Sequence, residues 1–346
     1  MRKTTTIGLD IAKRVFQVHG VDADGNIMVQ KQLSRKDVLN WFAELPSCLV
    51  GIEACATSTY WAREIEKVGH VVKLIPPAYV KPYVRRQKND RADAAAICEA
   101  VSRPSMRFVA IKTVEQQEIQ VLHRARELLV GQRVQTVNAL RAHLAEFGLV
   151  FPLGNIGVAQ AVAAVEEQSS SLVPPFAVKV LLSLVKQFGG IKEEIRELEK
   201  QMQQWHRSNN ESRRLAGIPG IGTVTATAII GAIGNGKQFK SGREFSAWIG
   251  LVPKQNSSGG KERLGRISKR GNAQLRTLLV VGATAMLKGS RRDKVPGGTW
   301  FRQLLLRKTP RVATVALANK MARVAWVVLA KGETYRDFAV EAAVAA

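Results

Sequence analysis

Residues 4–33 read TTTIGLDIAKRVFQVHGVDADGNIMVQKQL, and this stretch decides the fold class of the first part of the chain. β-Branched and apolar residues favour strands at 4–10, 15–21 and 27–33. The DADG segment at 22–25 favours a turn between the last two. Three neighbouring strands with short connections form a meander, so the chain opens on antiparallel strands.

Helix and strand signals alternate after this meander. The predicted elements are a helix capped by Ser34, a strand at 48–53, a helix opening near Ser58 or Thr59, a strand at 71–75, and a helix at 91–102 capped by Asn89 or Asp90. This order is typical of a ribonuclease H-like domain, in which helices flank a mixed sheet. We therefore expect an α/β fold here.

The remainder of the chain is expected to be helical. Apolar residues recur every three or four positions from 114 to about 147, which predicts a long helix. A second long helix carries a heptad seam of Ile191, Ile195, Leu198, Met202 and Trp205. The two helices can pair within the chain or with another subunit, because a heptad does not identify its partner. A short helix at 242–251, a polar loop at 256–260 and basic helices up to 330 are expected to follow.

The segment IPGIG at 218–222 predicts a helix-hairpin-helix motif. Gly220 and Gly222 permit a tight turn, and the backbone N–H groups of such a turn can bind a phosphate. The alternative is a structural turn between two packed helices.

The composition predicts a polyanionic partner. The 346 residues include 52 Lys and Arg against 28 Asp and Glu, a formal net charge of +24. Hydrophobic residues make up 46% of the chain, which is typical of a packed globular protein and excludes a disordered basic tail as the whole molecule.

The sequence favours the cytoplasm and no membrane partner. No apolar run reaches the roughly 20 residues that span a bilayer. Asp10 and Lys13 interrupt the N-terminal stretch, so we do not expect a signal peptide. The cysteines Cys48, Cys55 and Cys98 are odd in number and lie in apolar contexts, which favours a reducing compartment over disulfides or a zinc site.

Four acidic residues stand where metal-dependent phosphoryl transfer requires them. Asp10 and Glu53 end two predicted strands, and Asp90 and Asp93 lie on one face at the start of a helix. Converging carboxylates need cations to stay ionised, and hard oxygen ligands favour Mg²⁺ or Mn²⁺. Asp90 and Asp93 also have a structural explanation, because acids are favoured at helix N-termini.

Basic residues form two groups that are expected to contact phosphates. One group precedes the last two acids, and the denser one follows the hairpin. They are Arg85, Arg86 and Lys88, and Lys254, Lys261, Arg263, Arg266, Lys269 and Arg270.

Taken together, the segments GLDIAK, GIEACATSTYW, KNDRADAAAICEA, IPGIG and GLVPKQNSSGGKERLGRISKRGNAQLRTLL resemble the DEDD transposases of bacterial insertion sequences. These proteins are bridge-RNA-guided recombinases and distant relatives of the Piv DNA invertases. The resemblance implies a RuvC-like catalytic domain at 1–110, a coiled-coil oligomerisation region at 111–210 and a C-terminal transposase domain at 211–346.

The resemblance also implies a reaction. The acids Asp10, Glu53, Asp90 and Asp93 match the family's Mg²⁺-binding DEDD set, and Ser258, or its neighbour Ser257, matches the nucleophilic serine. The serine forms a phosphoserine with DNA, and a noncoding bridge RNA pairs with donor and target DNA. The family forms tetramers, so a homo-oligomer is expected.

Two other functions fit the residues. A RuvC-like endonuclease or Holliday junction resolvase would use the acids to activate water, with Ser258 structural. A non-enzymatic protein would hold branched DNA with the hairpin and basic helices.

Overall fold

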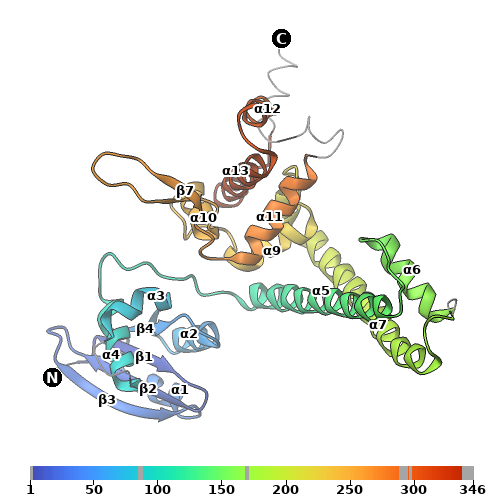
Figure 1. The fold of residues 1–346 in the computed structure, drawn as a ribbon. Coiled ribbons are helices and arrows are strands. Elements are labelled where there is room, and N and C mark those ends of the chain that lie inside the picture. The colour runs from blue at the N-terminus through green and yellow to red at the C-terminus, as the bar shows by residue number, and fades with distance from the viewer. Residues whose placement is uncertain (1–2, 85–88, 168–170, 288–294, 296–297, 337–346) are drawn as a thin grey trace. The chain divides into compact units, whose positions relative to one another are not determined.

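The computed structural model describes residues 3–84, 89–167, 171–287, 295 and 298–336. The chain divides into two compact units, Met1–Thr113 and Val114–Ala346 (Figure 1). Each unit is described separately below. The predicted division into three regions, at 1–110, 111–210 and 211–346, stays a prediction.

The first unit is built on a five-stranded mixed sheet. Its strands are β1 (Thr6–Ile11), β2 (Val15–Val21), β3 (Ile27–Ser34), β4 (Leu49–Glu53) and β5 (Val71–Ile75), in the order β3-β2-β1-β4-β5. The first three strands are antiparallel, whereas β4 is parallel to β1 and β5 is parallel to β4. This sheet confirms the predicted α/β class and meander, and it is consistent with a ribonuclease H-like domain.

Helices cover both faces of the sheet. They are α1 (Val38–Ala43), α2 (Ser58–Lys67), the short α3 (Pro77–Val80) with the 3₁₀ turn η1 (Lys81–Tyr83), and α4 (Asp90–Val101). One face carries a core in which Phe42 of α1 and Trp61 of α2 pack with strand residues such as Phe16. The opposite face lies beneath α4.

The predicted cap at Ser34 is wrong by several residues. Ser34 pairs with Val15 as the last residue of β3, and its hydroxyl donates a hydrogen bond to the Asp37 carboxylate. The helix begins at Val38 instead, and no side chain caps it. Pairing in the sheet extended the strand over the residue that was expected to start the helix.

The second unit is mainly helical. Its elements are α5 (Val114–Glu146), α6 (Asn155–Glu166), α7 (Pro175–Ser208), α8 (Asn210–Ala216), α9 (Thr223–Ile233), α10 (Gly242–Ile249), β6 (Pro253–Gln255), β7 (Leu264–Ile267), α11 (Ala273–Ala285), α12 (Gly298–Arg307) and α13 (Pro310–Ala330). The strands β6 and β7 form an antiparallel hairpin, so the expected loop at 256–260 joins two strands, and the basic segment after it is not helical.

The long helices α5 and α7 pack against each other within one chain (Figure 1). Ile191, Ile195 and Met202 of the predicted seam are buried. Arg126 of α5 forms a salt bridge of 2.6 Å with Glu199 of α7. The seam therefore packs within one chain, which is the first of the two alternatives for these helices.

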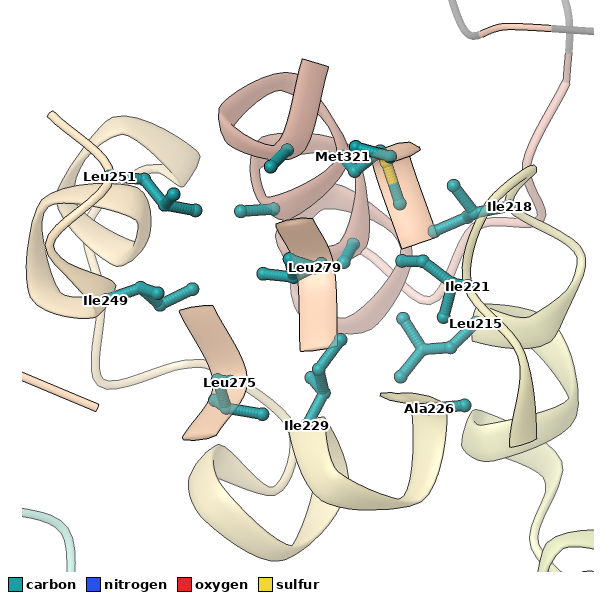
Figure 2. Close-up of a cluster of buried hydrophobic side chains, with 14 of the residues drawn as sticks. Leu215, Ile218, Ile221, Ala226, Ile229, Ile249, Leu251, Leu275, Leu279 and Met321 are labelled. Carbon is teal, nitrogen blue, oxygen red and sulfur yellow. The ribbon is translucent and has the colours of Figure 1, made fainter. Parts of the chain in front are cut away.

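The core of the second unit lies among α8, α9, α10, α11 and α13. Figure 2 shows Ile218 and Ile221, from the turn before α9, grouped near Met321 of α13. Among the described helices, α13 alone has the length and apolar composition of a membrane span, with half of its most apolar window buried. Leu317 and Met321 on its inner side belong to the core, so α13 is a core helix of this unit.

Candidate active site and nucleic-acid interface

Two glycines let α4 lie directly on the sheet. A side chain at Gly8 of β1 would collide with the backbone of Ala94 and Cys98 in α4. At Gly51 of β4, a Cβ atom would lie 2.7 Å from the Cβ atom of Val101. Only glycine permits so close an approach, which fixes where α4 begins relative to the strand ends.

The same face of the sheet carries Asp10 and Glu53. In the parallel pair β1 and β4, Leu9 lies opposite Ile52, so the two acids follow at the same edge. Each stands two residues after one of the glycines and therefore points to the same side of the sheet. This places both carboxylates on the face that α4 covers.

Asp90 and Asp93 occupy the first turn of α4. The side chain of Asn89 caps this helix by accepting a hydrogen bond of 2.9 Å from the Ala92 N–H group. Because Asn89 supplies the cap, capping does not account for the two aspartates.

The electrostatics of Asp10 show that the acids gather. The pKa of Asp10 is raised to about 6, mainly by burial and then by the negative charges of Asp93, Asp90 and Glu53. The pKa of Cys55, just beyond Glu53, is also raised, first by burial and then by Glu53 and Asp10. The fold thus concentrates negative charge at one end of the sheet.

The donor set suits a hard divalent cation. Carboxylate oxygens are the ligands that Mg²⁺ and Mn²⁺ prefer. The carboxamide oxygen of Gln17 also lies buried on this face. It has no hydrogen-bond partner among the described residues. Within the same residues, no three Asp, Glu, His or Cys side chains are close enough to share an ion. The fold therefore gathers suitable charges without closing a coordination shell.

Ser258 lies at the tip of the β6–β7 hairpin, which extends from α10 (Figure 1). Its backbone pairs with Lys261, and it is exposed. The neighbouring Ser257 hydroxyl accepts hydrogen bonds from the Arg263 N–H group at 3.1 Å and from the Gln255 side chain at 3.3 Å. Within the described part of the chain the Ser258 hydroxyl makes no hydrogen bond, so it is the less constrained of these two exposed serines.

The base of the hairpin is held by close backbone contacts. A Cβ atom at Gly250 or Gly271 would collide with the backbone of Arg270 or Trp248, respectively. Gly250 and Gly271 both have positive φ, which favours glycine. The hairpin therefore projects from a rigid base.

The predicted basic residues of the second group are all exposed. They are Lys254, Lys261, Arg263, Arg266, Lys269 and Arg270. Arg276, in contrast, donates a hydrogen bond of 2.8 Å to the Ile249 carbonyl oxygen and so braces the hairpin base. Arg85, Arg86 and Lys88 lie outside the described residues.

A groove of about 2270 Å³ along α13 brings further basic residues beside the hairpin. Its lining includes Arg266 and Lys269, together with Arg243 of α10 and Arg323 of α13. Arg243 and Arg323 were not predicted, because they lie outside the two dense basic groups of the sequence. Arg243 stands beside Glu244, and Arg323 is accompanied only by Lys320 in its part of α13.

The turn before α9 places the two predicted phosphate-binding glycines in different surroundings. Gly220 has a φ of +88°, and its Cα faces the core, where an added Cβ atom would lie 2.8 Å from Met321 Cε. Gly222 is exposed, precedes α9 and faces open space. Gly220 therefore serves packing here, while phosphate binding by this turn stays a prediction.

Comparison with known proteins decides the class of the molecule. A "Probable family 20 transposase" of Pseudomonas aeruginosa is 44% identical to this chain, over 95% of the chain and 98% of that protein. The model "Transposase IS116/IS110/IS902 family" matches residues 212–295. The chain belongs to this transposase family.

Further comparisons agree with this assignment. The DEDD transposase model of the IS110 family, described as "Transposase", matches residues 7–149 of this transposase and so includes all four acids. The transposase for insertion sequence element IS1328 of Yersinia enterocolitica is 41% identical, over 97% of this chain and 99% of its own length. The transposase for IS1111A of Coxiella burnetii is 39% identical, over 97% of this chain and 92% of its own length.

Proposed function

We propose that this insertion-sequence transposase cuts and rejoins DNA through a phosphoserine intermediate, with Ser258 as the nucleophile. Asp10, Glu53, Asp90 and Asp93 would hold Mg²⁺ or Mn²⁺. The observation that carries the proposal is the gathering of three further acids around half-buried Asp10 beneath α4. A carboxyl group whose pKa is raised by burial and by neighbouring carboxylates is typical of functional sites.

The chemistry divides between the two sets of residues. The Ser258 oxygen forms a bond to phosphorus, the bond from phosphorus to the DNA 3′ oxygen breaks, and the released oxygen takes up a proton. The reverse reaction with another 3′ hydroxyl rejoins the strand, so the bond energy is conserved and no nucleotide triphosphate is needed. A divalent cation would supply charge stabilisation at the reacting phosphate.

Both serines are exposed, and their hydrogen bonding favours Ser258 over Ser257 as the nucleophile. The Ser257 hydroxyl already accepts two hydrogen bonds that hold the hairpin. We therefore propose that Ser257 shapes the loop and that Ser258 reacts. Lys254, Lys261 and Arg263 on the same hairpin would neutralise the approaching phosphate.

The decisive experiment compares Ser258→Ala, Ser257→Ala and Asp10→Asn in cleavage of labelled donor DNA with Mg²⁺. We expect a denaturation-resistant protein–DNA adduct from the native chain and from Ser257→Ala, and neither adduct nor cleavage from the other two. Cleavage that survives in Ser258→Ala would instead indicate water attack, as in a junction resolvase. Equal DNA binding in EDTA with no cleavage by the native chain would indicate an architectural protein.

We further propose that target choice is delegated to a noncoding bridge RNA that pairs with donor and target DNA, in a homo-oligomer acting in the cytoplasm. The many exposed basic residues support a protein that contacts phosphates and leaves sequence to base pairing. Sequencing the RNA that copurifies with the full chain tests this. A discrete RNA with two loops complementary to DNA sites is expected, and bulk cellular RNA would contradict the proposal.

A further inference from the structure

Gln17 is a buried polar side chain to which the proposed function assigns no role. It lies on β2 and is only 3% exposed. Its carboxamide oxygen Oε1 is buried and has no hydrogen-bond partner among the residues that the structure describes. An unpaired buried acceptor costs about 1–3 kcal/mol, so such an atom in a native protein calls for a missing ligand or water.

The register of the sheet places Gln17 beside Asp10. The two residues lie directly opposite each other in the antiparallel pair β1 and β2. Residues opposite each other point to the same face, with Cβ atoms about 4.5–5.5 Å apart. The neighbours Phe16 and Val18 point to the other face and belong to the core there. Gln17 is therefore on the face of the acids.

The same helix covers both side chains. The helix α4 packs on β1 and β2, and its first turn carries Asp90 and Asp93. Oxygen atoms of β1 and β2 thus lie on the face of the sheet that α4 covers, and the first turn of α4 adds two further carboxylates. Carboxylates repel one another and an unpaired amide oxygen alike, and a cation is the partner that satisfies all of them.

We propose that the Gln17 carboxamide oxygen is a further, neutral oxygen ligand for the divalent cation of the acid site. The inference rests on the metal-binding part of the proposed function. A hard cation accepts amide oxygens as readily as it accepts backbone carbonyl oxygens, and a neutral ligand adds affinity without adding to the repulsion among the acids. Gln17 contributes this oxygen from β2, the second strand of the meander.

The test measures Mn²⁺ binding to the full chain by isothermal titration calorimetry, independently of DNA cleavage. Gln17→Leu keeps the size and removes the oxygen, Gln17→Glu keeps an oxygen but removes the N–H donor, and Asp10→Asn reports on the site itself. Gln32→Leu is the matched control, because Gln32 lies opposite Gln17 on β3 and is exposed. Unfolding in EDTA shows that each variant folds.

We expect Gln17→Leu to weaken Mn²⁺ binding roughly 10-fold or more, as loss of a supporting group at a metal site does. Gln17→Glu and Gln32→Leu should bind about as well as the native chain. In EDTA, Gln17→Leu should be at least as stable as the native chain, because it removes the unpaired oxygen.

Two results would overturn the inference. Native affinity in Gln17→Leu would show that the oxygen is not a ligand. An equal loss of binding in Gln17→Glu and Gln17→Leu would show that the amide N–H group acts instead, because both variants lack it. Unchanged binding in Asp10→Asn would count against the acid site as a whole, and so against the proposed function.

Discussion

At the scale of single residues, this transposase retains a group that is unfavourable for folding. Asp10 is partly buried among three other acids, and its pKa is raised from 3.8 to about 6. The unfolded chain loses this proton at lower pH than the folded chain does. The stability of the folded state therefore falls as the pH rises from about 4 to about 6, and the full cost is present above that window.

Asp10→Asn should remove this cost. In EDTA at pH 7.5 the variant is expected to melt at a higher temperature than the native chain, and at pH 4 the two should melt alike. Mg²⁺ should raise the melting temperature of the native chain and leave that of the variant unchanged. Thermal unfolding followed by circular dichroism measures all three comparisons. A lower melting temperature for the variant in EDTA would contradict this view of Asp10.

At the scale of elements, a few close contacts between helices and their neighbours fix where these helices lie. The helix α4 rests on Gly8 and Gly51, and its place on the sheet decides where Asp90 and Asp93 lie. In the second unit, α5 is joined to α9 by a buried hydrogen bond of 2.9 Å between His123 Nε2 and Thr227 Oγ1. Both contacts fall within a unit and can be tested separately.

Gly51→Ala should destabilise the protein by about 1–3 kcal/mol, because the new Cβ atom overpacks against Val101. The double variant Gly51→Ala, Val101→Ala should recover a small part of this loss, because it removes the two Val101 Cγ atoms at 3.1 Å and keeps the Cβ atom at 2.7 Å. Gly189→Ala is the control, because nothing lies near its Cβ position in α7, and it should stabilise by about 0.5–1 kcal/mol. Urea unfolding measures each value, and additive effects at Gly51 and Val101 would exclude the contact.

His123 should make the second unit sensitive to acid. Burial, and then Arg126, lower its pKa from 6.5 to about 4. The unfolded chain binds the proton first, so stability is full above about pH 6.5 and is lost as the pH falls towards 4. The loss amounts to about 3 kcal/mol at most for this shift.

His123→Gln should keep a donor to Thr227 and abolish this part of the pH dependence. Urea unfolding between pH 4.5 and 7 checks the prediction. His143→Gln, at an exposed position of the same helix, should leave the pH dependence as in the native chain. An identical pH dependence in all three proteins would exclude His123 as its source.

At the scale of the whole molecule, the net charge of +24 is the dominant property. Part of it lies on the exposed hairpin, and part lines the groove along α13. These residues come from segments far apart in the sequence, and folding of the second unit brings them together.

Arg266→Ala and Arg323→Ala should each weaken nucleic-acid binding and reduce the slope of log K against log salt by about 1, because each removes one phosphate contact. Both residues line the groove. Lys179→Ala, exposed on α7, should leave the slope unchanged. Fluorescence anisotropy with a labelled duplex at several salt concentrations measures the slopes. Equal slopes for all variants would remove the groove from the interface.

The sequence by itself determined the alternating strands and helices of the first unit and the positions of Asp10 and Glu53 at strand ends, because these depend on local periodicity and spacing. The transposase family followed from the resemblance of its motifs. Only the tertiary structure decided that α5 and α7 pair within one chain, that Ser258 lies on a hairpin, that Asn89 rather than Asp90 caps α4, and that Gln17 lies opposite Asp10. Strand register and close helix packing depend on contacts between residues that are distant in the chain. A repeating pattern in the sequence predicts the face on which a side chain lies, but it does not identify the residues that the side chain contacts.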